Sequence, residues 1–191
     1  MNILITGASR GLGKAMAEIL LTRGHNVLTP CRAALDVSSL RSIQEYASFV
    51  RNSGLKLHVL INNAAVIDAM PIAMETNAMG PWRLSEYLWP ILCQSSGRII
   101  NISSREGLPT NNGWRPYSVS KAALNAITRM HAASGEPVTV TACCPGWFRS
   151  GCGGDKAPIS ATEAADTPIW LATEATDCNG KFYINREVVP W

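Results

Sequence analysis

The sequence lacks the features that mark several other classes of protein. No apolar run approaches the ~20 residues of a membrane-spanning helix, and no repeat or low-complexity tract is present. The six cysteines include no C-x-x-C pair and the three histidines are isolated, so we expect reduced thiols and no metal site. Charged residues make up only 16% of the chain, and a net charge of +3 is too small to indicate nucleic-acid binding.

What is present indicates a single domain over residues 1–191. With 191 residues and 47% apolar content, the chain can bury a substantial core, and no segment resembles a linker. The N-terminus enters an apolar run directly, without a basic and then apolar signal region. We therefore expect a cytoplasmic protein with no membrane partner.

Strands and helices alternate along the chain, which is typical of a parallel sheet covered on both faces. Strands are expected near residues 2–6, 26–29, 57–62, 97–102, 138–143 and 181–184. Helices are expected near residues 12–23, 38–52, 73–94, 116–133 and 161–172, with Pro90 ending or kinking the third of them. The pattern predicts an α/β fold with a Rossmann-like, doubly wound parallel sheet in three α/β/α layers.

The segment 6–13, TGASRGLG, follows an apolar strand and precedes an amphipathic segment with helical spacing. Its glycines, Gly7, Gly11 and Gly13, let the backbone turn sharply and approach a pyrophosphate closely. The helix N-terminus that follows supplies amide donors for the same anion. A glycine trio alone is weak, so the prediction of a dinucleotide site depends on the strand before it and the helix after it.

The segment 117–121, YSVSK, is the most informative part of the chain. If Tyr117 and Lys121 lie in the first turns of a helix, their i,i+4 spacing places them on one face. A free tyrosine titrates near pH ~10, so an ammonium that lowers its pKa would suit it for proton transfer. Ser104, thirteen residues earlier, could hold a carbonyl oxygen. Alone, a Tyr-x-x-x-Lys pair is more often an ordinary surface contact.

These segments and further landmarks resemble the short-chain dehydrogenase/reductase family over nearly the whole chain. The landmarks are TGASRGLG at 6–13, LDVS at 35–38, NNAA at 62–65, Asn77, INISS at 100–104, YSVSK at 117–121 and CCPGWFRS at 143–150. The last landmark and the C-terminal segment look closest to the carbonyl reductases of that family. The resemblance implies an NAD(P)-dependent oxidoreductase.

The resemblance also implies catalytic roles for four residues. Tyr117 would donate a proton to the reduced oxygen, and Lys121 would lower the pKa of Tyr117 and hold the nicotinamide ribose. Ser104 would orient the carbonyl; the family's spacing selects it over Ser103, which is expected to be a structural hydroxyl. Asn77 would bind a water in the proton relay. It follows the NNAA motif more closely than is usual in the family, so a helix-bending or capping role is the alternative.

The choice of cofactor depends on the end of the second strand. An acidic residue there would accept hydrogen bonds from both ribose hydroxyls, whereas an arginine would pair with a 2′-phosphate. Arg32 stands at this end and Arg10 in the glycine-rich turn, so NADPH is favoured over NADH. The rival interpretation takes Asp36 as the ribose ligand of an NAD enzyme. Its LDVS setting resembles the family's third-strand motif, which assigns Asp36 to the adenine edge instead.

The remaining cofactor contacts also follow from the resemblance. Asn62 and Asn63 would close the adenosine side of the pocket, and Ala65 stands where the family usually has glycine. The segment 145–160 would lie over the nicotinamide as a mobile, glycine-rich loop, with a disordered surface turn as the alternative. The residues expected to contact the cofactor are Gly7, Ser9, Arg10, Gly11, Leu12, Gly13, Arg32, Asp36, Val37, Asn63, Ala64, Ala65, Tyr117, Lys121, Pro145, Gly146, Phe148 and Ser150.

The chain departs from the family pattern between Arg32 and Leu35. The family normally carries a whole helix and the lead-in to its third strand there, and only two alanines remain. Because a parallel crossover usually takes a dozen or more residues, we expect a short loop, one missing crossover helix and a vestigial or absent third strand. The adenine pocket would then be open on one side, which could weaken cofactor binding.

The leading interpretation is an NADPH-dependent oxidoreductase that reduces a ketone, aldehyde or quinone-like carbonyl. The alternatives are a cofactor-binding regulatory protein of the same fold with little catalysis, and a pteridine reductase. Trp114, Trp147 and Met70 are candidates to line an apolar substrate pocket. A homodimer or homotetramer is expected through the aromatic segment 81–92 and the helix after Tyr117, with ordinary packing against the sheet as the alternative.

Overall fold

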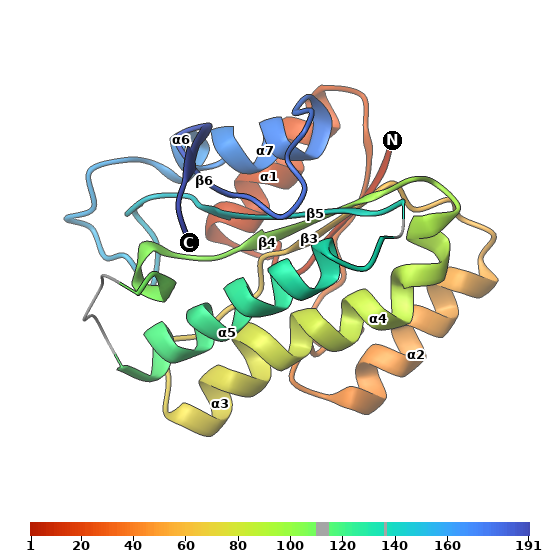
Figure 1. The fold of residues 1–191 in the computed structure, drawn as a ribbon, viewed down its shortest axis with the longest axis horizontal. Helices are drawn as coiled ribbons and strands as arrows, with labels where there is room; N and C mark the ends of the chain where they lie inside the picture. The colour runs from red at the N-terminus through yellow and green to blue at the C-terminus, as the bar shows by residue number, and fades with distance from the viewer. Residues whose placement is uncertain (110–114, 136) are drawn as a thin grey trace.

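The computed structural model describes residues 1–109, 115–135 and 137–191, and these form a sheet with helices on both faces (Figure 1). The sheet has seven strands in the order β2-β1-β3-β4-β5-β6-β7, all parallel except β7, which pairs antiparallel with β6. The strands are β1 (Asn2–Ile5), β2 (Asn26–Leu28), β3 (Val59–Asn62), β4 (Arg98–Ile102), β5 (Thr139–Cys144), β6 (Phe182–Ile184) and β7 (Glu187–Val189).

The helices form the two outer layers of a three-layer α/β/α fold. One face is covered by α1 (Gly11–Thr22), α6 (Ala161–Ala164) and α7 (Asp166–Thr173), and the other by α2 (Leu40–Asn52), α4 (Gly80–Cys93) and α5 (Arg115–Ala132) (Figure 1). The short α3 (Met70–Met74) and a π-helical turn (Glu75–Met79) lead into α4, and a 3-10 turn (Arg105–Gly107) follows β4.

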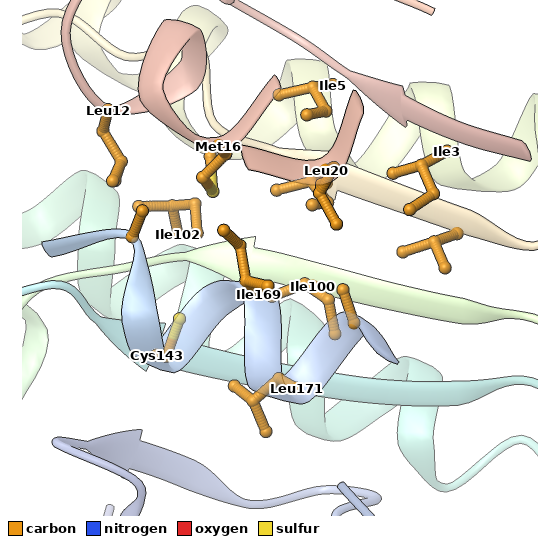
Figure 2. Close-up of a cluster of buried hydrophobic side chains, with 14 of the residues drawn as sticks. Ile3, Ile5, Leu12, Met16, Leu20, Ile100, Ile102, Cys143, Ile169 and Leu171 are labelled. Carbon is orange, nitrogen blue, oxygen red and sulfur yellow. The ribbon is translucent and has the colours of Figure 1, made fainter. Parts of the chain in front are cut away.

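The alternation of side chains along β1 shows how the sheet is buried on both faces. Ile3 and Ile5 point toward the layer of α1 and α7, whereas Leu4 points toward α2 and α4, and all three are fully buried. On α1, Met16 and Leu20 follow the helical spacing and pack onto β1 with α7 (Figure 2). Continuous apolar strands and amphipathic helices therefore produce the two cores.

The six predicted strands are present, and the predicted fold class is confirmed. The final strand, β7, was missed because it is only three residues long and mostly exposed. The helix expected at 73–94 begins earlier, at Met70, and includes the π-helical turn. The prediction that Pro90 ends or kinks this helix near Trp89 is wrong about its end, because α4 continues to Cys93. Pro90 lacks the N–H that would bond to the preceding turn, but Ile91 and Leu92 after it are buried in the core, which holds the last turn in place.

The connection between β2 and α2 is short, as the sequence predicted. Among the described residues no strand lies between Leu28 and α2, so β2 is the edge of the sheet and pairs only with β1. Leu35 and Val37 are buried against α2 and α4, which anchors the loop. Gly80 permits this approach, because a Cβ there would lie 2.4 Å from the Val37 carbonyl oxygen.

The aromatic segment expected at an oligomer contact packs largely within the chain. Tyr87 on α4 accepts a hydrogen bond from Gln44 of α2 (2.7 Å), and Trp89 lies against the ring of His131 on α5 (5.1 Å between centroids). Leu84 and Leu88 are fully buried in the core. These contacts account for much of the segment without a second copy, and the oligomeric state stays a prediction.

Candidate active site

The glycine-rich turn after β1 is locked to the turn after β3. The Thr6 hydroxyl accepts hydrogen bonds from the backbone N–H groups of Asn63 and Ala64, each 3.0 Å long, and Asn63 Nδ2 donates to the carbonyls of Thr6 (2.8 Å) and Gly7 (3.1 Å). Gly7 has a φ of +67°, and a Cβ there would lie 2.8 Å from Ala64 Cα. The turn therefore requires glycine at this position.

The start of α1 fits the pyrophosphate of a dinucleotide. A Cβ at Gly13 would lie 2.5 Å from the Gly7 carbonyl oxygen, so glycine allows the helix to begin directly over the turn. The first turn of α1 carries no acidic side chain, and Arg10, at the N-cap, makes no side-chain capping bond. The first amides of the helix are thus available to an anion at the positive end of the dipole.

Other residues predicted to contact the cofactor are distributed around this turn. Ser9 and Ala65 are exposed, whereas Leu12 is buried in the core and can offer only its backbone. Ser150 stands opposite Gly11, 3.9 Å from the position of a Cβ there. This contact brings the segment after β5 over the glycine-rich turn, as a nicotinamide-covering segment requires.

The segment 145–160 is folded through its own hydrogen bonds. Trp147 Nε1 donates to the Gly153 carbonyl (2.8 Å), and the Arg149 backbone N–H donates to the Ile159 carbonyl (2.9 Å). Phe148 packs against the core, and Gly146 takes a φ of +85° after Pro145. Met70 and Trp147 are 40% and 59% exposed and remain candidates for a substrate pocket, while Trp114 lies outside the described residues.

Tyr117, Lys121 and Ser104 come together where β4 ends and α5 begins. The Lys121 ammonium is buried, donates to the Ile102 carbonyl (2.7 Å) and lies 5.6 Å from the centre of the Tyr117 ring. The Ser104 hydroxyl faces the Tyr117 hydroxyl and lowers its pKa. Gly107 allows α5 to lie this close to the loop after β4, because a Cβ there would be 2.7 Å from the Lys121 backbone.

Burial is the main cause of the pKa shifts of Tyr117 and Lys121. It raises the pKa of Tyr117 to about 12, against the opposing effect of the Ser104 hydrogen bond, and lowers the pKa of Lys121 to about 8. Desolvation of the phenol outweighs the lowering effect of Ser104, so the net pKa of Tyr117 is raised, and the expected lowering by Lys121 stays a prediction. At neutral pH Tyr117 is a protonated phenol and Lys121 is mostly charged.

Asn77 lies in the π-helical turn and is fully buried. Its Oδ1 accepts from the Val66 backbone N–H (2.8 Å), and its Nδ2 donates to the Val66 carbonyl (2.8 Å) and the Ser120 hydroxyl (3.0 Å). Ser120 in turn donates to the Tyr117 carbonyl (2.7 Å). Asn77 thus ties the chain after β3 to the first turn of α5, and a water could use only the second lone pair of Oδ1.

A buried chain of side-chain amides, which the sequence analysis missed, holds α5 to the sheet. Asn62 Nδ2 donates to Asn101 Oδ1 (2.9 Å) and to the Ser85 hydroxyl (3.2 Å), and Asn101 Nδ2 donates to the Thr128 hydroxyl (2.9 Å). Every one of these residues is buried. Polar residues at positions inside two apolar strands were the available signal, because a buried amide needs partners.

Ser103 has the structural role expected of it. Its hydroxyl donates to Asn125 Oδ1 on α5 (2.6 Å), and Asn125 Nδ2 donates to the Gly107 carbonyl (3.1 Å). Ser104 instead accepts from the Glu106 backbone N–H (3.2 Å) and faces Tyr117. Only the second of the adjacent serines therefore faces the tyrosine.

On the adenosine side, Arg32 and Asp36 form an ion pair with each other. Arg32 Nε donates to Asp36 Oδ2 (3.0 Å), while Asp36 Oδ1 accepts from the Ser38 backbone N–H (2.9 Å) and hydroxyl (2.6 Å). Burial raises the pKa of the Asp36 carboxyl, but the hydrogen bonds from Ser38 and Arg32 outweigh it and hold the pKa below its ordinary value. Asp36 is thus a carboxylate at neutral pH.

Among the described residues, no group of three or more His, Cys, Asp or Glu side chains could hold a metal ion. Within the same residues, no helix combines the length and apolar character needed to cross a membrane.

Comparison with known proteins places the chain in a family. The sequence model described as short chain dehydrogenase matches residues 31–158. The chain belongs to the short-chain dehydrogenase family. The predicted family and enzyme class are thus confirmed, and the protein is an oxidoreductase of that family.

Several relatives within this family are carbonyl reductases. The chain is 27% identical to "Carbonyl reductase [NADPH] 1" of Sus scrofa over 270 aligned positions, which cover 98% of this chain and 93% of the relative. The Homo sapiens protein of the same name is 26% identical, with 98% and 97% covered. Because 270 aligned positions exceed the 191 residues of this chain, the relatives contain segments that it lacks, in keeping with the short β2–α2 connection.

Solved structures agree with this placement. The crystal structure of an NADPH-bound carbonyl reductase from chicken fatty liver superposes with a TM-score of 0.87 at 27% identity, covering 100% of this chain and 98% of that one. A short-chain dehydrogenase/reductase from Burkholderia multivorans with bound NADP has a TM-score of 0.82 at 25% identity, with 100% and 99% covered. Both resemblances span the fold and the candidate site.

Proposed function

We propose that the protein is an NADPH-dependent reductase of ketones, aldehydes or quinone-like carbonyls, with Tyr117 as the proton donor. The arrangement that carries the proposal is a protonated, half-buried phenol that faces Ser104, with the Lys121 ammonium 5.6 Å from the centre of its ring. The names of the relatives support NADPH as the cofactor. NADPH, when bound, supplies a hydride to the carbonyl carbon.

The chain's own groups serve the oxygen of the substrate. The hydroxyl groups of Ser104 and Tyr117 donate hydrogen bonds to the carbonyl oxygen, which polarises the carbonyl and fixes its distance from both. As negative charge develops on that oxygen, Tyr117 transfers its proton. A phenol with a pKa of about 12 is fully protonated at neutral pH, and an alkoxide is basic enough to take its proton.

Lys121 has two functions in this proposal. Its buried ammonium stabilises the phenolate that remains after proton transfer. One of its three N–H donors is used by the Ile102 carbonyl, which fixes the ammonium and leaves donors for the ribose of the cofactor. Asn77 acts through Ser120 by holding the first turn of α5 in place, and we assign it a positioning role.

A regulatory protein of the same fold is the second candidate, because the short β2–α2 connection leaves the adenosine side with a three-residue edge strand. A direct test measures NADPH consumption with a panel of activated ketones, aldehydes and quinones, for the wild type and Tyr117→Phe, and repeats it with NADH. Turnover that is lost in the variant supports the reductase. Binding of NADPH without consumption by any compound would favour the regulatory protein.

A further inference from the structure

The short connection between β2 and α2 contains an ion pair between Arg32 and Asp36. Only three residues separate Arg32 from Asp36, and the turn between them is closed by hydrogen bonds from the backbone N–H groups of Ala34 and Leu35 to the Cys31 carbonyl (both 3.0 Å). The turn brings the guanidinium and the carboxylate to 3.0 Å. One local turn therefore brings the two partners of the pair together.

The two partners are held with very different firmness. Asp36 receives two hydrogen bonds from Ser38, and its own backbone N–H donates to the Ser42 hydroxyl of α2 (2.9 Å). The neighbours of Asp36 in the chain, Leu35 and Val37, are buried in the core. The Arg32 side chain is 82% exposed, and Asp36 is its partner through Nε. The carboxylate is thus the fixed member of the pair and the guanidinium is the movable one.

This pair lies on the adenosine side of the candidate cofactor site. Strands β1 and β2 are parallel neighbours, so the glycine-rich turn after β1 and the loop after β2, which holds Arg32, both lie at the carboxyl ends of the strands. Leu35 and Val37 share a core cluster with Ala64, and Ala64 contacts Gly7. Asp36 therefore lies close to the place where an adenosine ribose would rest.

We propose that Asp36 limits the affinity of the site for 2′-phosphorylated adenosine by holding the guanidinium of Arg32. This inference rests on the proposed function. A 2′-phosphate must draw Arg32 away from Asp36 and must also approach a fixed carboxylate, and both effects weaken its binding. Arg10 is exposed and makes no capping bond, so it is the arginine that is free to meet the phosphate first. Asp36 thus reduces the preference of the site for NADPH over NADH.

The test measures binding, with four probes and one matched control. Calorimetry gives the Kd of wild type, Asp36→Asn and Asp177→Asn for NADPH, NADH, adenosine 2′,5′-bisphosphate and 5′-AMP. Asp177→Asn makes the same substitution in another i,i+4 ion pair, with Lys181 (2.7 Å), beside β6 on the far side of the sheet. Thermal unfolding of each variant confirms that it is folded.

We expect Asp36→Asn to bind NADPH and the 2′,5′-bisphosphate about fivefold more tightly, the effect of removing one exposed charge beside a phosphate. Its affinity for NADH and 5′-AMP should not increase, since these probes lack the 2′-phosphate. Asp177→Asn should match the wild type with all four probes.

A double-mutant cycle isolates the role of Arg32. Arg32→Gln should weaken NADPH binding more in the Asp36→Asn background than in the wild type, because the guanidinium is free only there. Equal losses in the two backgrounds would overturn the proposal. So would unchanged or weaker binding of the 2′-phosphorylated probes by Asp36→Asn while the wild type binds NADPH. A wild type that binds neither NADPH nor NADH would instead refute the proposed function itself.

Discussion

The two ends of the candidate site are built differently. At the catalytic end, Lys121 and Asn77 are buried, and hydrogen bonds made by buried side chains connect β3, β4 and α5. At the adenosine end, the edge strand β2 has three residues and the arginine expected to meet a phosphate is 82% exposed. Buried hydrogen bonds therefore hold the catalytic end in place, whereas the adenosine end is a short, exposed loop.

The difference follows from what each end must do. Proton transfer depends strongly on the positions of donor and acceptor, and a displacement of ~1 Å can cost ~100-fold in rate. Binding of the adenosine half can be shared among backbone amides, the helix dipole and a few charges, so the loss of one strand removes only part of it. A shortened chain can therefore keep the chemistry while its affinity for the cofactor changes.

The largest expected effect is that of Tyr117→Phe, which removes the proton donor at the catalytic end. We expect kcat to fall by about 10²–10⁴-fold, the range typical of a general acid. The Kd for NADPH should change by less than about threefold, because the phenol hydroxyl contributes little to binding the adenosine half. Steady-state kinetics and calorimetry on the same preparation measure both. If Tyr117→Phe lowered kcat and the affinity for NADPH by similar factors, the two ends would not have separate functions.

Substitutions of the adjacent serines sharpen the comparison within the catalytic end. Ser104→Ala should lower kcat by about 10–100-fold, since it removes one donor to the carbonyl oxygen. Ser103→Ala is the matched control. It breaks a buried bond to Asn125 of 2.6 Å, so it should cost about 1 kcal/mol in the free energy of unfolding and leave kcat within about threefold. Denaturant unfolding and steady-state kinetics of both variants test this prediction. A larger loss of kcat in Ser103→Ala than in Ser104→Ala would contradict it.

The buried Lys121 should reduce stability in a way that depends on pH. Burial lowers its pKa from the ordinary 10.5 to about 8, so between these values the unfolded chain binds more protons and the free energy of unfolding rises with pH. The destabilisation is complete below pH 8 and disappears above 10.5. We expect Lys121→Met to be about 1–3 kcal/mol more stable than the wild type at pH 7 and to lose this advantage by pH 10.5.

Denaturant unfolding of Lys121→Met and the wild type across this pH range tests the prediction. The same variant should lose most of its turnover, which would show that the buried charge is retained for function at a cost in stability. An equal stability difference at every pH would show that packing, and not the ammonium, sets it.

The smallest expected effect lies at the adenosine end. In the wild type, Arg10→Gln should raise the Kd for NADPH by about fivefold, and Arg32→Gln by about twofold at most, because Asp36 already holds Arg32. Neither should alter kcat at saturating NADPH. Calorimetric titrations at low and moderate salt measure the difference, and a larger loss with Arg32→Gln would reverse the order of the two arginines.

The sequence predicted the fold and the candidate residues because both depend on local patterns. The spacing of YSVSK places Tyr117 and Lys121 on one helical face, and the glycines of the first turn predict a sharp turn of the backbone. The contact of that turn with Ala64 is visible only in the structure. The same patterns could not reveal the partner of Asn62 or Asn101, since those bonds join residues far apart in the chain. Burial of Tyr117, which reverses the expected direction of its pKa shift, is likewise a property of the whole fold.

Pro90 and the Arg32–Asp36 pair show two further limits. A proline removes one helical hydrogen bond to the preceding turn, and the sequence alone could not show that burial of Ile91 and Leu92 lets α4 continue past it. The sequence offered Arg32 and Asp36 as separate cofactor ligands, and only the fold of the short loop brings them to 3.0 Å from each other.

The most direct test of the central claim, that the shortened chain retains the chemistry, follows a label from cofactor to product. Saturating NADPH that carries deuterium at both hydrogens of the hydride-bearing carbon is incubated with the ketones and aldehydes of the panel, and the alcohols are analysed by mass spectrometry. The account predicts an alcohol with one deuterium on the former carbonyl carbon, formed by the wild type and nearly absent with Tyr117→Phe. No labelled alcohol from a wild type that calorimetry shows to be saturated with NADPH would contradict it.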